Sequence, residues 1–337
     1  MTASARMRSW AGILLAVGLS LATLHPPAAV AAPRPVRVVV LGDSYSSGNG
    51  AGFYYGPEGC YRSPHGWVEQ YAGGLRGAGY EVTLVNRACS GAETEDILNE
   101  RVMGRTTHSI SLLGDRRADE AAARQTLTGL GLCVTQHPDE ERYEIAAASM
   151  FNGLTTTFTF TCTRMLAPQI QAVDTGTDLV LMTIGGNDIH YAALVRNCFV
   201  LSDVAGCRRS VQTAAGLLDA IRNRVAGVLT RLGRRLNSNA QVALVSYPYL
   251  EMDDNFTLWS LHPPDTYRAG EEIRKLGRRG DEIQADAVTA ANRTVGRNFA
   301  GFVSGVKERF AGHEPDGRLL LQNLNGWLYE LASPIPA

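Results

Sequence analysis

The segment Gly42-Asp-Ser-Tyr-Ser-Ser-Gly-Asn-Gly50 follows directly on the apolar run Val36-Arg-Val-Val-Val-Leu41 and decides the fold class. The run is short and mostly β-branched, as is typical of a strand buried inside a sheet. The polar, glycine-containing segment cannot continue that strand and indicates a tight turn at its carboxyl end. Ser44 is therefore predicted to lie at the carboxyl end of a central strand, where open α/β sheets hold their active sites. The structural alternative is that the Asp and Ser merely cap the next element.

Two later segments repeat this arrangement of a strand followed by a polar turn. Val82–Asn86 precedes a turn that contains Gly91, and Asp178–Ile184 precedes a turn that contains Asn187. Because the carboxyl ends of parallel strands meet at one edge of a sheet, these turns are expected to face a shared cleft with Ser44. An attacking hydroxyl surrounded by amide donors is the equipment for acyl transfer, since the donors stabilise the developing oxyanion.

Helices and strands alternate along the rest of the chain. Amphipathic periodicity predicts helices at residues 65–76, Val211–Leu236 and Asp281–Phe299, and apolar runs predict strands at Ala240–Tyr247 and Gly301–Val306. This alternation predicts a parallel, doubly wound, flavodoxin-like three-layer αβα sandwich.

Residues from about 103 to 165 interrupt the alternation. They contain a charged stretch, Asp119–Arg124, and a threonine-rich stretch, Leu154–Cys162. We expect an insertion that is partly helical and partly extended. Whether it borders the substrate cleft or is a surface excursion without a functional role stays open.

The three turns resemble the motifs of the SGNH (GDSL-type) hydrolase family, most closely those of secreted actinobacterial esterases and lipases. Ser44 matches the family nucleophile, Gly91 matches the glycine of the second motif in Ala-Cys-Ser-Gly-Ala-Glu-Thr, and Asn187 matches the asparagine of Gly-Gly-Asn-Asp. The resemblance implies that the N–H groups of Ser44 and Gly91 and the side-chain amide of Asn187 form the oxyanion hole. It also implies the hydrolysis of carboxylic esters through an acyl-enzyme on Ser44, with no metal and no organic cofactor.

The family's histidine is harder to place. None of the seven histidines lies in the C-terminal Asp-x-x-His that family members usually carry. A Trp-x-x-His-Pro stretch occurs at Trp259–Pro263 but comes too early, before a long helical stretch, whereas His313 follows the last predicted strand. Three explanations stay open: the chain is truncated near Ala337 ahead of the missing block, a histidine already present has become the base (His313 as first choice, His262 as second), or the base has been lost.

The first residues have the pattern of a signal peptide over residues 1–31. Arg6 and Arg8 precede an apolar stretch from Ala11 to Leu24, and Ala29-Val-Ala31 supplies a cleavage site of small residues. The apolar stretch is short for a membrane span, and no later segment is long enough. We therefore expect a secreted, extracellular protein without an integral membrane segment after cleavage, with residues 32–337 as one hydrolase domain.

The cysteine content fits export to an oxidising compartment. Six cysteines form an even set without the Cys-x-x-Cys spacing of a metal site, so three disulfides are expected. Fifteen pairings are possible, and the family resemblance implies the sequential one: Cys60–Cys89, Cys133–Cys162 and Cys198–Cys207. The first bridge would attach the turn that contains Gly91 to the loop after Ser44.

The net charge of the chain limits which classes of binding partner are expected. The net charge is −1 with both signs interspersed, which does not indicate nucleic acid or an anionic membrane as a partner. We expect a monomer that acts on a small-molecule, lipid or acetylated-carbohydrate ester, and the sequence does not choose among these substrates. The alternative is a catalytically impaired SGNH-like domain or binding module of a larger secreted protein.

Overall fold

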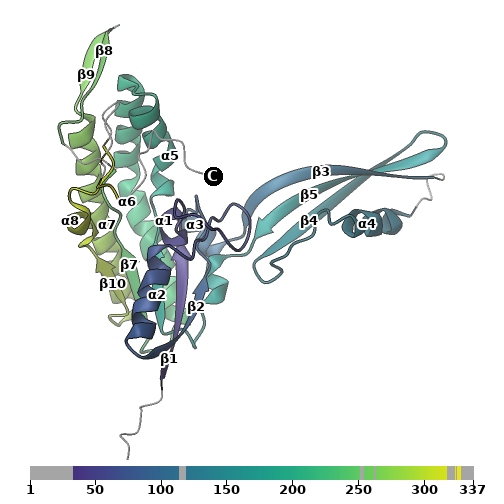
Figure 1. Cartoon of the computed structure of the whole chain (residues 1–337), viewed down its shortest axis with the longest axis horizontal. Helices are drawn as coiled ribbons and strands as arrows, with labels where there is room; N and C mark the ends of the chain where they lie inside the picture. The colour runs from purple at the N-terminus through teal and green to yellow at the C-terminus, as the bar shows by residue number, and fades with distance from the viewer. Residues whose placement is uncertain are drawn as a thin grey trace, which may run out of the picture. The chain divides into compact units, whose positions relative to one another are not determined.

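A parallel sheet forms the centre of the computed structural model, which describes residues 33–113, 119–250, 254–261, 263–316, 323 and 325–327. Its five strands lie in the order β10-β7-β6-β1-β2 (Figure 1). They are β1 (Arg34–Gly42), β2 (Tyr80–Asn86), β6 (Leu179–Thr183), β7 (Gln241–Val245) and β10 (Ala300–Val303). Renumbered among themselves, these strands run 2-1-3-4-5, which is the flavodoxin-like order. The predicted fold class is confirmed.

Alternate side chains of β1 supply the two apolar interfaces of the sandwich. Val39 and Leu41 pack into the main core with α6 (Val204–Arg235) and α7 (Ala269–Val295). Val38 and Val40 point the other way, into a smaller core that includes Val68 of α2 (Trp67–Gly77). This alternation follows from the two-residue period of a strand, and it gives a sheet covered by helices on both faces.

The two long helices begin earlier than predicted. α6 begins at Val204, where the side chain of Asp203 accepts a hydrogen bond from the N–H of Ala205 as an N-cap. α7 begins at Ala269 instead of Asp281, and buries Ile273 and Leu276 in its additional turns. Charged residues and glycines interrupt the apolar stripe in these first turns of α7. The helical periodicity therefore did not predict that the helix begins at Ala269.

The remaining elements are short. They comprise α1 (Ser44–Ser47), α3 (Thr94–Leu98), η1 (Gln169–Ala172), η2 (Asn187–Ile189), α5 (Tyr191–Val195), η3 (Arg196–Val200) and α8 (Val306–Phe310). The strands β8 (Leu258–Leu261) and β9 (Pro264–Tyr267) form an antiparallel pair that was not predicted.

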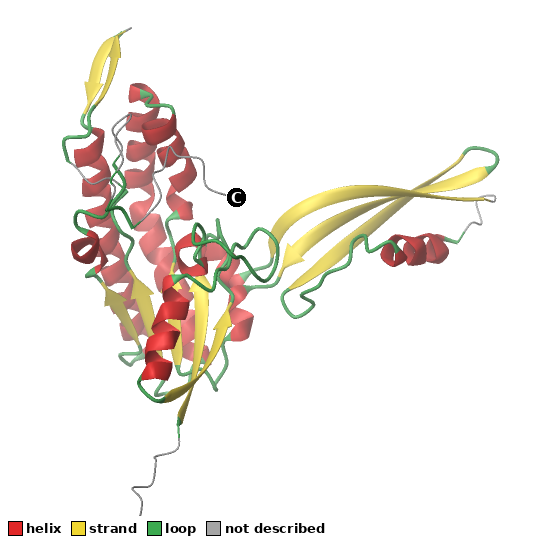
Figure 2. Ribbon diagram, viewed as in Figure 1, coloured by secondary structure: helices red, strands yellow, loops and turns green. Residues whose placement is uncertain are grey.

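The insertion forms a second sheet with its own small core. Its strands are β3 (Arg101–Leu113), β5 (Thr155–Leu166) and β4 (Glu141–Phe151), paired antiparallel in the order β3-β5-β4 (Figure 2). Helix α4 (Glu120–Gly129) packs Ala123 and Leu127 against Phe158 and Phe160. The insertion is thus partly helical and partly extended, and we call these three strands the inserted sheet.

The three disulfides pair as the family resemblance implied: Cys60–Cys89, Cys133–Cys162 and Cys198–Cys207. Within the part of the chain that the structure describes, no helix is both long enough and apolar enough to span a bilayer. The predicted signal peptide, residues 1–31, lies outside the described residues.

Candidate active site

The turn after β1 makes Ser44 the first residue of helix α1. The side chain of Asp43 caps this helix by accepting a hydrogen bond from the N–H of Tyr45 at 3.1 Å. Gly42 has a φ of +116°, and a Cβ at this position would lie 2.1 Å from the carbonyl oxygen of Thr183. Only glycine fits this close approach, so the sharp bend before Ser44 depends on Gly42.

Gln169 holds the same turn in place through two hydrogen bonds. Its Oε1 accepts from the N–H of Gly42 at 2.6 Å, and its Nε2 donates to the Gly42 carbonyl at 3.0 Å. The N–H of Cys89 donates to that carbonyl as well, at 2.9 Å. Gln169 is buried, so both backbone groups of Gly42 are satisfied without water.

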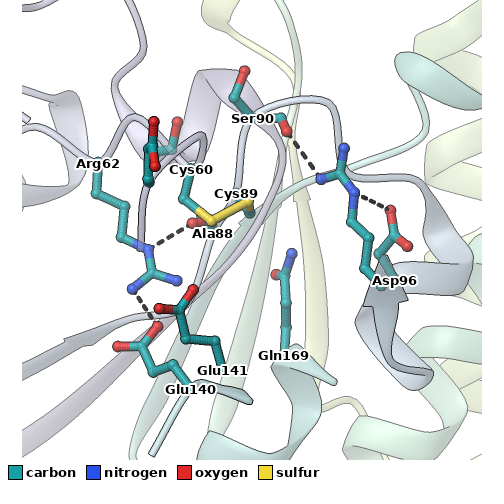
Figure 3. Close-up of a disulfide and its surroundings, with 12 residues drawn as sticks. Cys60, Arg62, Ala88, Cys89, Ser90, Asp96, Glu140, Glu141 and Gln169 are labelled. Atoms are coloured by element: carbon teal, nitrogen blue, oxygen red, sulfur yellow. Dashed lines mark hydrogen bonds and ion pairs between the residues drawn. A yellow bond between two sulfur atoms is a disulfide. The ribbon is translucent and has the colours of Figure 1, made fainter. Parts of the chain in front are cut away.

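The second turn, residues Arg87–Ala92, is called here the oxyanion loop, after the role that the resemblance implies for Gly91. Gly91 adopts a φ of +74°, and a Cβ there would lie 2.9 Å from Nη2 of Arg101. Nη1 of Arg101 donates to the carbonyl of Ser90 at 2.9 Å, and Figure 3 draws this bond beside the Cys60–Cys89 bridge. The guanidinium therefore lies directly against Gly91.

The third turn carries Asn187 at the start of η2. Nδ2 of Asn187 donates to the carbonyl of Ala92, the last residue of the oxyanion loop, at 2.8 Å. The next residue, Asp188, accepts two further bonds from Thr94, from its N–H at 3.0 Å and from its hydroxyl at 2.6 Å. These contacts attach the turn after β6 to the segment that follows β2.

A buried polar group joins the first turn to the third. The N–H of Asp43 donates to the Thr183 carbonyl at 3.1 Å, and the Thr183 hydroxyl donates to Oδ1 of Asp43 at 2.8 Å. The hydroxyl of Tyr247, just beyond β7, donates to Oδ2 of Asp43 and accepts from the N–H of Gly186 at 3.4 Å. The residues directly before Ser44 and Asn187 thus share one partner, and the three turns converge.

Burial changes the pKa values of Asp43 and Tyr247. It raises the pKa of Asp43 from 3.8 to about 6, against hydrogen bonds from Tyr247 and Thr183 that lower it. Burial, together with the nearby charge of Asp43, raises the pKa of Tyr247 well above its usual value. The Asp43 side chain also caps α1, as the structural alternative for this segment predicted.

His313 lies in the segment after α8 and takes part in none of the hydrogen bonds described above. Its Nδ1 is 2.6 Å from the carbonyl oxygen of Asn325, and its ring stacks on Trp327 with centroids 3.9 Å apart. Since a carbonyl only accepts, Nδ1 carries the proton and Nε2 of the neutral ring is left as an acceptor. The second choice, His262, lies outside the described residues.

Several supporting residues escaped the sequence analysis: Gln169, Thr183, Tyr247 and Arg101. Tyr247 is the last residue of a predicted strand, which placed it at the same rim as the three turns. Gln169 and Arg101 gave no signal, because they come from a segment with no motif and from the edge of the insertion.

Among the described residues, no three His, Cys, Asp or Glu side chains are grouped so that they could hold a metal ion. Hydrogen bonds among the turns after β1, β2 and β6 thus bring the segments that carry Ser44, Gly91 and Asn187 to one edge of a flavodoxin-like sheet, as expected for the SGNH class of hydrolases.

Comparison with known proteins agrees with this class. No protein-family model matches the chain. The chain is 26% identical over 339 residues to a lipase of Streptomyces rimosus, with 99% of this chain and 91% of the relative covered. It is 25% identical over 241 residues to Lipase 1 of Streptomyces coelicolor, with 70% of this chain and 61% of that relative covered.

Solved structures show the same fold. The extracellular lipase of Streptomyces rimosus matches with a TM-score of 0.55 and 21% identity, over 89% of this chain and 90% of that one. Phospholipase A1 of Streptomyces albidoflavus NA297 matches with a TM-score of 0.51 and 21% identity, over 88% and 87%. The fold and the sequence similarity to Streptomyces lipases fit the SGNH (GDSL-type) hydrolase family.

Proposed function

We propose that the chain is a secreted esterase or lipase in which Ser44 is the nucleophile. The convergence of the three turns supports this assignment, because it brings the backbone around Ser44, Gly91 and Asn187 to one rim of the sheet. The hydroxyl oxygen of Ser44 attacks the carbonyl carbon of the ester, and the former carbonyl oxygen becomes an oxyanion.

The oxyanion is stabilised by three N–H donors. Two are the backbone N–H groups of Ser44 and Gly91, and the third is the side-chain amide of Asn187. Nδ2 of Asn187 has two hydrogens. One donates to the Ala92 carbonyl and fixes the amide, so the other remains for the substrate oxygen. Donors fixed before the reaction lower the barrier because no reorganisation is required as the charge develops.

His313 is the proposed general base. Its Nε2 takes the proton from the Ser44 hydroxyl and passes it to the leaving alcohol when the ester bond breaks. Water then attacks the acyl-enzyme, the same nitrogen takes its proton, and Ser44 leaves with that proton as the carboxylic acid is released. The carbonyl of Asn325 holds the ring in the required tautomer, in the position that a carboxylate occupies in other catalytic triads. His262 is the second candidate.

Three disulfides support a proposed location outside the cell, where such bridges persist. The related Streptomyces rimosus lipase is described as extracellular. The proposed substrates are esters of lipids, short-chain alcohols or acetylated carbohydrates.

A fluorophosphonate that reacts with activated serines tests the assignment. Mass spectrometry should place the label on Ser44, and Ser44→Ala should abolish both labelling and ester hydrolysis. Asn187→Ala should lower kcat about 10²- to 10³-fold, as loss of one oxyanion donor does elsewhere. His313→Gln should abolish labelling if it is the base. A folded protein that takes no label would instead support a non-catalytic binding module.

A further inference from the structure

The two faces of the inserted sheet differ. One face packs against α4 and forms the small core around Ile110, Phe158 and Phe160. The other face carries the alternate residues of each strand, which are exposed on β3 and β4 and half-buried on the central strand β5. We call this second face the open face.

Hydroxyl and methyl groups dominate the open face. Its central strand carries threonine at every second position, and its flanking strands carry serine, threonine and alanine opposite them. The register gives four successive rows, namely Thr107–Thr161–Ala146, Ser109–Thr159–Ala148, Ser111–Thr157–Met150 and, at the base, Arg105–Thr163–Glu144. The Ser111 and Thr157 hydroxyls are 2.9 Å apart, so neighbouring strands also bond across the face.

The three outer rows of this face carry no charge. The sequence from Ile145 to Thr163 contains no Asp, Glu, Lys or Arg, and neither does the stretch from Thr106 to Leu113. The charged side chains lie at the base of the face, where Arg105 and Glu144 share the basal row and Glu144 pairs with Arg142, the open-face residue of β4 before it.

Apolar side chains gather at the far end of the same sheet. Leu113 ends β3 and is 80% exposed, Met150 lies near the end of β4 and is 74% exposed, and Leu154, in the turn between β4 and β5, is 70% exposed. We call these three residues the apolar tip. Exposed apolar groups that gather in this way mark an interaction surface, whereas scattered ones do not.

We propose that the open face and its apolar tip bind the surface of an aggregated, uncharged ester or lipid. A protein partner would be anchored by aromatic residues or arginine and by oriented charges, whereas the three outer rows of the face hold no aromatic ring and no charged side chain. A neutral lipid–water interface demands less: apolar side chains to enter the hydrocarbon and hydroxyls to meet the headgroup layer. Because the outer rows and the apolar tip carry no charge, their binding does not depend on anionic lipid.

The binding is a property of the insertion alone, whereas its use in catalysis rests on the proposed function. An ester hydrolase whose substrate is aggregated gains from an anchor that keeps it at the interface. The insertion would then raise turnover of emulsified substrate without changing the chemistry at Ser44.

Flotation with phosphatidylcholine vesicles tests the binding. The test variant is Leu113→Ser/Met150→Ser/Leu154→Ser. The matched control is Leu130→Ser/Val134→Ser, which changes exposed apolar residues of the same insertion (64% and 50% exposed) in the segment from the end of α4 to β4. The wild-type protein and the control should float with the vesicles both at low salt and at roughly 0.5 M salt, a concentration that screens surface charge. The affinity of the test variant for the vesicles should be at least about tenfold lower. A tenfold change corresponds to about 1.4 kcal/mol of binding free energy.

Hydrolysis of two substrates separates this proposal from the proposed function. On soluble p-nitrophenyl acetate all three proteins should be equal, and on emulsified tributyrin the test variant should be at least about tenfold slower. Wild-type protein that ignores vesicles, or test and control variants that bind equally, would overturn the proposal. So would a dimer in sedimentation equilibrium that the test variant abolishes, since a second copy would then cover this face. An inactive wild-type protein would refute the proposed function, while the flotation result would still decide the binding.

Discussion

The carboxylate of Glu140 lies 2.5 Å from the guanidinium of Arg62, and this ion pair joins the inserted sheet to the oxyanion loop. Glu140 directly precedes β4, and its other oxygen lies 2.5 Å from Nη1 of Arg87, the first residue of the loop. Arg62 is almost fully buried and also donates its Nε to the carbonyl of Ala88 at 2.7 Å (Figure 3). One carboxylate therefore holds two cations that support the loop.

Removing this carboxylate should destabilise the whole domain. Glu140→Ala leaves the buried guanidinium of Arg62 without its counter-charge, and such losses cost about 3–5 kcal/mol. Urea unfolding should report the change in free energy. The control is Glu144→Ala, whose carboxylate pairs with Arg142 on the surface, where both side chains are about half exposed. That change should cost less than about 1 kcal/mol. Equal losses in the two variants would contradict this account.

Arg101 is predicted to position the oxyanion donor at Gly91. Its guanidinium bonds the Ser90 carbonyl and lies 3.5 Å from the Asp96 carboxylate, so it fixes the peptide next to Gly91. Arg101→Ala should lower kcat on a soluble ester by about 10- to 100-fold with KM little changed, because the oxyanion exists only after the attack.

Two further variants separate positioning from general damage. Arg101→Lys keeps one cationic donor without the planar fork and should recover part of the lost kcat. Arg105→Ala removes an exposed arginine of the same strand that bonds Thr163, and it should leave kcat unchanged. If KM rises instead while kcat holds, Arg101 contacts the substrate and does not act through the loop.

The strands and turns that place Ser44 could be predicted because their pattern is local. β-branched runs followed by glycine and polar residues specify a buried strand and its turn within about ten positions, and the alternation of elements specifies a parallel sheet. The cysteine pairing came from the family resemblance, since six cysteines alone allow fifteen pairings.

The contacts that fix the site could not be read from the sequence, because they join distant segments. Gln169 bonds Gly42 across 127 positions, and Tyr247 bonds Asp43 across 204. Neither residue lies in a motif, and each is defined by the close approach of strands that the fold creates. The early start of α7 was missed for a different reason, since charged residues mask its apolar stripe around Leu276.

The two longer disulfide loops offer a matched test of the oxyanion loop. Cys60–Cys89 and Cys133–Cys162 each join residues 29 positions apart, so their effects on the entropy of the unfolded chain are equal. Replacing either pair by alanine should cost about 2–4 kcal/mol of unfolding free energy. The Cys60–Cys89 bridge holds the oxyanion loop at Cys89, so its loss alone should also lower kcat, by about tenfold or more, as small misplacements of catalytic groups do. If both variants keep full kcat, the bridge stabilises the fold without holding the loop.

Asp43 should make the domain less stable as the pH rises. Its pKa is 3.8 in an ordinary environment and about 6 in the folded protein, because burial disfavours the charged form. Between these values the folded state binds more protons than the unfolded one, so the free energy of unfolding falls with pH. The difference of about two pKa units corresponds to about 3 kcal/mol, fully present below pH 4 and lost above about pH 6. Asp43→Asn cannot titrate at this position. Urea unfolding at pH 4 and pH 7 should therefore show a fall in the wild-type protein, relative to the variant, of about this size. Parallel profiles would mean that hydrogen bonds from Tyr247 and Thr183 stabilise the carboxylate enough to offset its burial.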